Sequence, residues 1–435
     1  MRARTIGVDE RVPLLQSVPL SLQHLFAMFG ATVLVPFLVG LDTSVTLFSS
    51  GVGTLLYIAV TKGKIPAYLG SSFAFIAALS GILAVKPGQV APDDRIALAM
   101  GGCVTVGVVY ILVSLAIAKF GSEWIEKLLP PVVIGPVVMV IGLGLAGVAV
   151  NVMAMQGGTG TYHPEFFRVA LAALVIAILA AVFLKGFLGV IPVLIGIIGG
   201  YAVALVAGQV NLGGVTAART FAVPHFVFPK FDLGVMLTLA PISLVVITEH
   251  IGHLVVTGNV VGKDFMKNPG LHRSLGGDGV ATAFAGLVGG PPNTTYGENI
   301  GVMAITRVFS VWVIGGAAVL AIALSFFPAV GALIRSIPTQ VMGGICILLF
   351  GIIAAAGLRM LVDARVDFAS KRNLIITSVI LVIGIGGARI HLGSVELGEM
   401  SLATYVGILL NLVLPRGIDV ADQEAVVTAE TQPDV

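Results

Sequence analysis

Long apolar segments recur along the whole chain, and they constrain its fold more than any other feature. A helix that spans a membrane needs about 20 mostly apolar residues. About fourteen segments meet this description, near residues 18–40, 43–61, 66–85, 96–118, 129–150, 166–184, 187–207, 233–258, 275–291, 296–313, 314–333, 338–358, 373–391 and 398–415. Only 11% of the residues are charged, against about 25% in soluble domains. The sequence therefore predicts an all-α, polytopic protein of the lipid bilayer.

The basic residues predict how the chain is oriented. Fourteen segments place both termini on one side of the membrane, and 17 of the 24 Lys and Arg residues fall on that side. Because basic loops favour the cytoplasm, both termini are predicted to be cytoplasmic. Residues 1–17 then form a polar cytoplasmic segment, and residues 416–435 form an acidic, disordered cytoplasmic tail. The net charge of +2 is too small to indicate a nucleic-acid partner.

Two of the apolar segments contain residues that break a helix. The third segment opens with Pro66 and continues with small and polar residues as far as Ser72. The tenth begins at Tyr296, shortly after Pro291 and Pro292. Such residues interrupt a spanning helix and expose backbone N–H and C=O groups that lipid cannot satisfy. A pair of broken segments is typical of the substrate site of a carrier.

Two glutamates inside apolar segments indicate a functional site. Glu249 lies in the eighth segment and Glu298 in the tenth. A charged side chain at membrane depth costs about 3 kcal/mol or more, so it is tolerated where it faces a cavity, a partner or a substrate. Asp278 is placed at the cytoplasmic end of the ninth segment, where a charge costs less. The alternative to a binding role is a structural pair that holds two helices together.

Two histidines lie close to Glu249 in the eighth segment. Glu249 and His253 are four residues apart and share a helix face, whereas His250 is rotated by about 100°. A carboxylate and an imidazole together can hold and pass on a proton. The order Glu-His-x-x-His differs from the His-Glu-x-x-His of zinc metalloproteases, and no metal is predicted. The two cysteines, Cys103 and Cys346, lie in apolar runs and are interpreted as small core residues.

The two halves of the chain resemble each other weakly. Gln23-His24 in the first segment corresponds to Glu249-His250 in the eighth, and the broken third segment corresponds to the broken tenth. Seven segments per half would insert the second half upside down, as in carriers built from inverted repeats. Ordinary membrane composition also produces such pairs, so the pattern alone leaves both interpretations open.

The run that begins at Glu298 resembles the signature of the nucleobase–ascorbate transporter family. That signature is Gln or Glu, Asn, any residue, Gly, four residues, Thr and a basic residue, and residues 298–307 read Glu-Asn-Ile-Gly-Val-Met-Ala-Ile-Thr-Arg. The runs 23–24, 66–75 and 248–253 are also similar to the family. The resemblance covers nearly the whole chain, from about residue 12 to residue 415.

The resemblance implies an architecture. Fourteen segments would form two inverted repeats of seven, divided between a core domain (18–118 and 233–333) and a gate domain (129–207 and 338–415). The broken third and tenth segments would each contain a short strand, and the two strands would pair antiparallel. Members of the family commonly form homodimers through the gate domain.

The resemblance also implies a function. Within the family the chain looks most like the bacterial uracil–proton symporters, because purine-transporting members usually have Gln where this chain has Glu298. It implies a secondary transporter of the bacterial cytoplasmic membrane that imports uracil with protons by alternating access. It implies no enzymatic activity and no cofactor, with the proton as the coupling ion. The alternatives are a purine, xanthine or urate carrier of the same family, or an anion carrier or channel of related fold.

The implied binding site combines carboxylates, backbone donors and an aromatic ring. Glu249 and Glu298 would accept hydrogen bonds from the two ring N–H groups of uracil. Backbone N–H groups near Gly297 and in residues 72–75 would donate to its carbonyl groups. The sequence leaves open which aromatic ring lies close to the base, and the candidates are Phe73, Phe75 and Tyr296.

The remaining roles concern the proton and the support of the site. We expect Glu249 to take up the proton, assisted by His253 and by Tyr296 through water. His24 is interpreted either as a site residue or as a buried imidazole bonded to its surroundings. The residues expected to support the site are His24, Ser72, Asn299 and Thr306.

Overall fold

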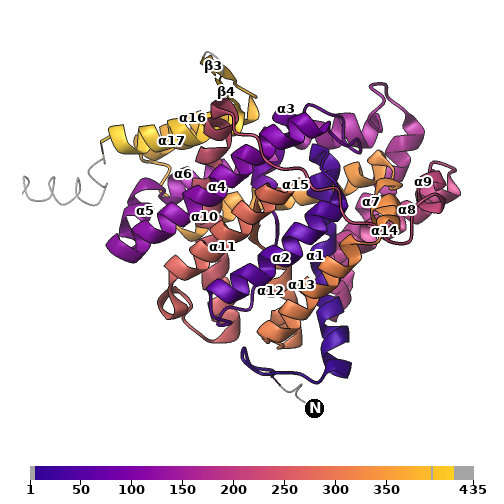
Figure 1. The fold of residues 1–435 in the computed structure, drawn as a ribbon. Coiled ribbons are helices and arrows are strands. Elements are labelled where there is room, and N and C mark those ends of the chain that lie inside the picture. Colours follow the sequence, from indigo (N-terminus) through magenta and orange to yellow (C-terminus); the bar gives the residue numbers. More distant parts are fainter. Residues whose placement is uncertain (1–4, 393–394, 416–435) are drawn as a thin grey trace, which may run out of the picture.

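The structure is a computed structural model that describes residues 5–392 and 395–415, and this part of the chain is mostly helical (Figure 1). Its helices are α1 (Leu14–Val39), α2 (Thr43–Val60), α3 (Ile76–Leu83), α4 (Asp93–Phe120), α5 (Glu123–Leu128), α6 (Pro131–Gly144), α7 (Pro164–Phe183), α8 (Pro192–Val206), α9 (Gly213–Thr216), α10 (Leu233–Val261), α11 (Leu271–Val288), α12 (Gly297–Thr306), α13 (Val311–Ser325), α14 (Pro328–Arg335), α15 (Thr339–Asp363), α16 (Lys371–Ile385) and α17 (Glu399–Val413). Tighter or wider helical turns are η1 (Phe73–Phe75), η2 (Val148–Met155), η3 (Gly186–Val190) and η4 (Met266–Gly270), and the strands are β1 (Leu69–Ser71), β2 (Asn293–Thr295), β3 (Ile390–Leu392) and β4 (Val395–Leu397).

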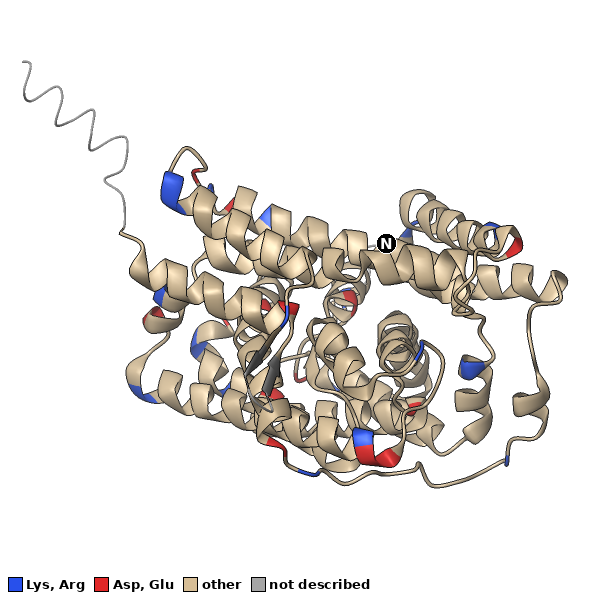
Figure 2. Ribbon diagram, turned by 90° about the horizontal axis from the view of Figure 1, so that it is seen from above, with Lys and Arg blue, Asp and Glu red and all other residues tan. Residues whose placement is uncertain are grey.

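The helices have the surface of a membrane protein. Among the described residues, seven helical stretches are long and apolar enough to cross a bilayer, and α13 with α14 forms a further pair bent by 84°. Helix α7 exposes large apolar side chains that water would not favour, including Leu171, Ile178 and Phe183. Charged residues lie chiefly at helix ends and in loops (Figure 2). The prediction of a mostly helical, multi-pass membrane protein is confirmed.

The helices pack in two groups. In the first group α2 and α4 both contact α11, α13 lies against α1 and α2, and α10 lies against α4. In the second group α15 contacts α6, α7 and α8, while α16 lies between α6 and α17. The two groups meet where α10 contacts α6 and α17 and where α1 contacts α8.

The two broken segments meet through their strands. β1 pairs antiparallel with β2, with Leu69 opposite Thr295 and Ser71 opposite Asn293. The ladder continues at both ends, because the N–H of Ser72 donates to the carbonyl of Pro292 at 2.9 Å and the N–H of Tyr296 donates to that of Tyr68 at 3.0 Å. All six strand residues are buried. The predicted antiparallel pairing is thus confirmed, and it satisfies backbone groups that lipid could not.

A threonine from a neighbouring helix fixes each strand in the same way. The hydroxyl of Thr54, on α2, accepts from the N–H of Leu69 at 3.0 Å and donates to its carbonyl at 3.3 Å. The hydroxyl of Thr282, on α11, accepts from the N–H of Asn293 and donates to its carbonyl, both at 3.2 Å. Each hydroxyl thus lies within hydrogen-bond distance of both the N–H and the carbonyl of one strand residue, Leu69 in β1 and Asn293 in β2.

The N-terminal segment differs from the sequence interpretation. It was expected to be a polar cytoplasmic segment up to residue 17, but α1 begins at Leu14 and the residues before it lie along the connection between α12 and α13 (Figure 1). Ile6 bridges Val308, and its N–H donates to the carbonyl of Arg307 at 3.0 Å. Val8 is 3% exposed and belongs to the apolar cluster that contains Tyr296. Alternating Ile and Val side chains on this segment therefore pack as a strand would.

Replacing Val8 with aspartate is expected to destabilise the protein, because it buries a carboxylate without a partner. We expect the midpoint of thermal unfolding of the purified protein in detergent to fall by about 5 °C. Thr5→Asp adds the same charge at an exposed neighbouring position and is expected to leave the midpoint unchanged. Equal midpoints for the two variants would show that the segment does not pack against α12 in solution.

Other boundaries moved by a few residues. The fifth segment, expected to end near residue 150, continues from α6 through η2 to Met155. The short strands β3 and β4 had not been expected, and they form a hairpin before α17. The predicted disordered tail, 416–435, lies outside the described residues.

Candidate functional site

The two glutamates lie where α10 meets the starts of both broken helices. Helix α10, which carries Glu249, contacts η1, β2 and α12, and α12 begins one residue before Glu298. Both glutamate side chains are partly exposed, and neither forms an ion pair or a side-chain hydrogen bond with another residue in the described part of the chain. The charges of the two carboxylates are close enough to interact with each other. They are therefore available to a ligand from two different helices.

The starts of the broken helices supply hydrogen-bond donors. Ser72 precedes η1 and Tyr296 precedes α12, and neither side chain caps its helix. The first N–H groups of a helix have no partner within it, and they carry a partial positive charge. Because β1 and β2 pair antiparallel, the two helices begin at opposite ends of the short ribbon, and α10, which carries Glu249, contacts both of them.

His253 lies against the start of α12. Its Nδ1 is 3.2 Å from the hydroxyl of Thr295, and a Cβ built on Gly297 would lie 3.4 Å from its Nε2. The ring is partly exposed. The helical spacing predicted that His253 and Glu249 share a face, and the fold places His253 between Glu249 and the tenth segment.

A third carboxylate belongs to this region, and its predicted position was wrong. Asp278 was placed at a cytoplasmic segment end, but it lies within α11, which extends from Leu271 to Val288, and its side chain is 0% exposed. Its Oδ2 is 2.8 Å from Nδ1 of His250, which is 1% exposed. Removing one member of such a buried pair is strongly destabilising, because it leaves the other without its partner.

The pair ends a chain of hydrogen bonds. Nε2 of His250 is 2.8 Å from the hydroxyl of Ser274, which is 2.6 Å from that of Tyr57. If Nε2 of His250 accepts from Ser274, whose oxygen accepts from Tyr57, then the ring proton of a neutral His250 is on Nδ1, the nitrogen that lies 2.8 Å from Oδ2 of Asp278. Neither carboxylate oxygen of Asp278 has a hydrogen bond of good geometry to a described residue, so the imidazole and the carboxylate interact chiefly through their 2.8 Å contact. Thr295 connects this chain to the site, because its hydroxyl lies 3.5 Å from Nδ1 of His250 and 3.2 Å from His253.

The aromatic candidates occupy different surroundings. Phe75 is 0% exposed within the apolar core. Phe73 is partly exposed and borders a void between the broken third segment and α6. The hydroxyl of Tyr296 donates to the carbonyl of Ser71 at 3.1 Å and contacts the hydroxyl of Thr32 at 3.2 Å. Its ring also lies against Gly70, where an added Cβ would approach it to 2.5 Å. Of the three rings, Phe73 is the one whose side chain remains partly free.

The site contains no arrangement suited to a metal ion. Within the described ranges, no group of three or more His, Cys, Asp and Glu side chains could hold one. The two cysteines are buried and unpaired, as their apolar surroundings predicted.

Comparison with known proteins identifies the family. Residues 15–393 match the model of a permease family, which is the nucleobase–ascorbate transporter family. The chain belongs to this family. The chain is 55% identical over 415 residues to the uracil permease of Bacillus subtilis (strain 168), covering 92% of each chain. It is 48% identical over 431 residues to the uracil permease of Escherichia coli (strain K12), covering 99% of this chain and 98% of that one. As a member of a family of permeases, the chain is a transporter and not an enzyme.

Solved structures with the same fold come from other transporters. The transmembrane domain of a cyanobacterium bicarbonate transporter, BicA, has a TM-score of 0.61 at 14% identity and covers 93% of this chain and 99% of its own. Murine Slc26a9, an anion transporter in the inward-facing state, has a TM-score of 0.69 at 13% identity, over 98% of this chain and 70% of its own. At these identities the likeness concerns the fold alone.

The family signature acts partly as a structural clamp. The side-chain amide of Asn299 donates to the carbonyl of His24 and contacts Nδ1 of the same residue, both at 3.1 Å. Thr306 donates to the carbonyl of Val302 at 2.8 Å, and its oxygen accepts from the N–H of Val308 at 3.3 Å. Asn299 thus ties α12 to α1, and Thr306 closes the end of α12. His24 is 1% exposed, and Asn299 links it to α12.

Proposed function

We propose that the protein imports uracil together with protons across the bacterial cytoplasmic membrane, by alternating access. The observation that carries this proposal is the meeting of two partly exposed glutamates, Glu249 and Glu298, with two uncapped helix starts. Relatives that share 48–55% of their residues over nearly the whole chain are named uracil permeases, which supports this substrate.

The chemistry of uracil matches the site. Uracil is a flat, neutral ring with two N–H donors and two carbonyl acceptors. Glu249 and Glu298 accept from the N–H groups, and backbone N–H groups at the start of α12, near Gly297, and at residues 72–75 donate to the carbonyls. Phe73 lies against the ring. A site built from hydrogen bonds rejects analogues that leave its buried groups unpaired.

Proton coupling follows from the carboxylates. Glu249 takes up a proton on the outside, with His253 beside it, and uracil then connects Glu249 and Glu298. A neutral, occupied site can move through the membrane without a bare charge. The chain from Thr295 through His250 to Asp278 offers further groups between which a proton can be passed. Tyr296 contributes by holding β1 against β2 and positioning the start of α12.

The architecture that we propose is fourteen segments in two inverted repeats of seven. The matched hydrogen bonding of Thr54 to β1 and of Thr282 to β2 supports this relation, since both threonines lie on the helix next to their broken segment in the proposed repeat. The first group of helices corresponds to the core domain (18–118 and 233–333), and the second to the gate domain (129–207 and 338–415). Both termini are cytoplasmic, and two copies associate through their gate domains.

Two other functions are less well supported. A purine, xanthine or urate carrier would share the backbone donors, and competition of xanthine with uracil for binding separates the two. An anion carrier or channel is suggested by the fold of BicA and Slc26a9. An anion site needs positive charge, however, and here the helix starts face two glutamates, with Asp278 close behind.

Uptake into proteoliposomes tests the proposal. With the outside acidic, we expect labelled uracil to accumulate above its external concentration, and an ionophore that collapses the proton gradient should abolish the accumulation. A sodium gradient alone should drive none. Accumulation driven by sodium but not by the pH gradient would refute proton coupling, and failure of uracil to bind at any pH would refute the substrate.

A further inference from the structure

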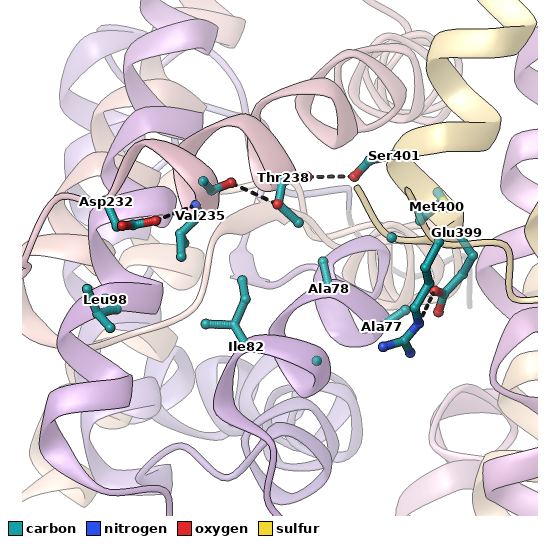
Figure 3. Close-up of a pocket in the computed structure, with 14 residues that line it drawn as sticks. Ala77, Ala78, Ile82, Leu98, Asp232, Val235, Thr238, Glu399, Met400 and Ser401 are labelled. Carbon is teal, nitrogen blue, oxygen red and sulfur yellow. Dashed lines mark hydrogen bonds and ion pairs between the residues drawn. The ribbon is translucent and has the colours of Figure 1, made fainter. Parts of the chain in front are cut away.

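A cavity separate from the two glutamates lies between the helix groups. It has a volume of about 260 Å³, near the lower end of small-molecule sites, about 300–1,000 Å³. Helix α3 lines it with Ala77, Ala78 and Ile82, the start of α10 with Val235 and Thr238, and the start of α17 with Glu399 and its neighbours (Figure 3). Its wall is thus mostly apolar on α3 and more polar on α10 and α17, as a flat polar ring would require.

The cavity lies on the same path as the glutamate site. Thr238 and Glu249 are eleven residues apart on α10, which is about three turns and about 16 Å, so the two side chains share one helix face. On the third segment, Ala77 in the cavity follows Phe73 by four residues. The ends of α3, α10 and α17 around the cavity belong to the side that the distribution of basic residues assigns to the exterior.

Side chains close the path between the cavity and Phe73. A second void of about 10 Å³ shares Ala77, Glu399 and Met400 with the cavity, and Phe73 and Ile141 of α6 form its other walls. This volume is no more than about one water molecule occupies. The cavity is therefore separated from the glutamate site by a constriction at Phe73 and Met400.

Polar contacts hold the constriction together. The hydroxyl of Ser401 donates to the carbonyl of Thr238 at 2.6 Å and so joins α17 to α10 across the two helix groups (Figure 3). Nε of Arg389 is 3.5 Å from Oε2 of Glu399 on the wall of the cavity. The Ser401–Thr238 hydrogen bond must break if α17 moves away from α10, whereas the Arg389–Glu399 pair lies within the second helix group.

We propose that this cavity is an outer vestibule that receives a neutral pyrimidine before it reaches the glutamates, and that Phe73, Met400 and the Ser401–Thr238 hydrogen bond form the outer gate. The proposal rests on the proposed function for its substrate and its direction. It adds a second binding position on the path of the substrate and assigns α17 a role in closing that path.

Cysteine labelling in intact cells tests the vestibule. The native Cys103 and Cys346 are 0% exposed, so labelling by a membrane-impermeant methanethiosulfonate reports an introduced cysteine. In Ala78→Cys we expect labelling from outside to reduce uracil uptake at least tenfold. Ala217 is an exposed residue directly after α9, and labelling of Ala217→Cys should leave uptake unchanged. An unlabelled Ala78→Cys, or a labelled one with full uptake, would overturn the vestibule.

Two further measurements complete the test. Labelled Ala78→Cys should still bind uracil in detergent, because the glutamate site is unmodified. Loss of binding by the labelled protein in detergent would contradict a vestibule that is distinct from the glutamate site. Absence of uracil binding in every variant, including the unmodified protein, would instead refute the proposed function.

The outer gate is tested with a second cysteine. Ala74→Cys, beyond the constriction, should react with the reagent from outside at least threefold faster when Ser401 is also replaced by alanine. An unchanged rate would overturn the gate.

Discussion

Replacing Glu298 with glutamine is expected to weaken uracil binding by a factor on the order of 100. The change keeps the shape of the side chain and removes its charge. A hydrogen bond to a charged acceptor contributes about 3 kcal/mol at most, and 1.4 kcal/mol corresponds to a factor of ten in affinity. The amide also brings an N–H₂ group that can face the ring N–H of uracil, where two donors would oppose each other. Equilibrium binding of labelled uracil to the purified variant measures the effect.

The matched control is Glu123→Gln, which removes the same charge at an exposed position on α5. Its affinity for uracil is expected to equal that of the unaltered protein. Thermal unfolding of both variants shows whether the Glu298→Gln protein is folded, and we expect it to be, because Glu298 forms no ion pair or side-chain hydrogen bond with another described residue. A folded Glu298→Gln protein that binds uracil with undiminished affinity would remove Glu298 from the site.

The parts of this site that could be predicted from sequence are those with a local signal. A carboxylate in an apolar segment is costly wherever it lies, so Glu249 and Glu298 stand out without a structure. Prolines and glycines beside Tyr296 indicated a break in the helix, and the family resemblance implied the pairing of β1 with β2. The spacing of Glu249 and His253 gave their common face directly, because helix geometry fixes it.

Asp278 was misplaced because its surroundings are ambiguous in sequence. The run Leu-Gly-Gly-Asp-Gly after Ser274 looks like a helix end, yet α11 continues through it. These glycines allow close packing: a Cβ on Gly277 would approach the ring of Tyr57 to 2.8 Å, and one on Gly279 would approach the carbonyl of Gly107 to 2.9 Å. Tertiary contact with α2 and α4 thus overrides the weak helix propensity of glycine, and only the folded chain reveals it.

The choice between Phe73 and Phe75 and the position of the N-terminal segment also required the fold. Two phenylalanines in one short segment cannot be told apart by residue type. In the fold, η1 points Phe75 into the core and leaves Phe73 partly exposed. The polar composition of residues 1–10 masked the alternation of Ile6 and Val8. Ile6 contacts Val308 and Val8 contacts Val311, and these contacts join positions about 300 residues apart, for which a single sequence carries no signal.

Asp278→Asn is expected to abolish proton-driven uracil uptake, reducing it at least about 100-fold, while the protein remains folded. The amide oxygen can take the place of Oδ2 beside Nδ1 of His250, so the neutral imidazole, its hydrogen bond to Ser274 and the hydrogen bond between Ser274 and Tyr57 are expected to be preserved. What is lost is the negative charge 2.8 Å from Nδ1 of His250. The measurement is uptake into proteoliposomes under a pH gradient, compared with exchange of labelled for unlabelled uracil at equal pH.

Exchange at equal pH separates a role in coupling from a structural role. We expect exchange to fall much less than uptake, because exchange requires no net release of the proton. Asp278→Ala differs from Asp278→Asn in leaving Nδ1 of the buried His250 without an acceptor, and loss of one partner of a buried pair costs about 3–5 kcal/mol. That variant is therefore expected to lose both stability and exchange. Asp363→Asn, which removes an exposed ion pair with Arg359, serves as the control and should behave like the unaltered protein.

A double variant decides whether the two buried groups act as a unit. If Asp278 serves through His250, then adding His250→Gln to Asp278→Asn should cause little further loss of uptake, because residues of one network have non-additive effects. Two independent roles would instead multiply the losses. Full pH-driven uptake by Asp278→Asn would contradict the role of this pair and leave the proton to Glu249 and His253 alone. If Asp278→Asn lost exchange to the same extent as uptake, the role of Asp278 would be structural, to hold α11 against α10.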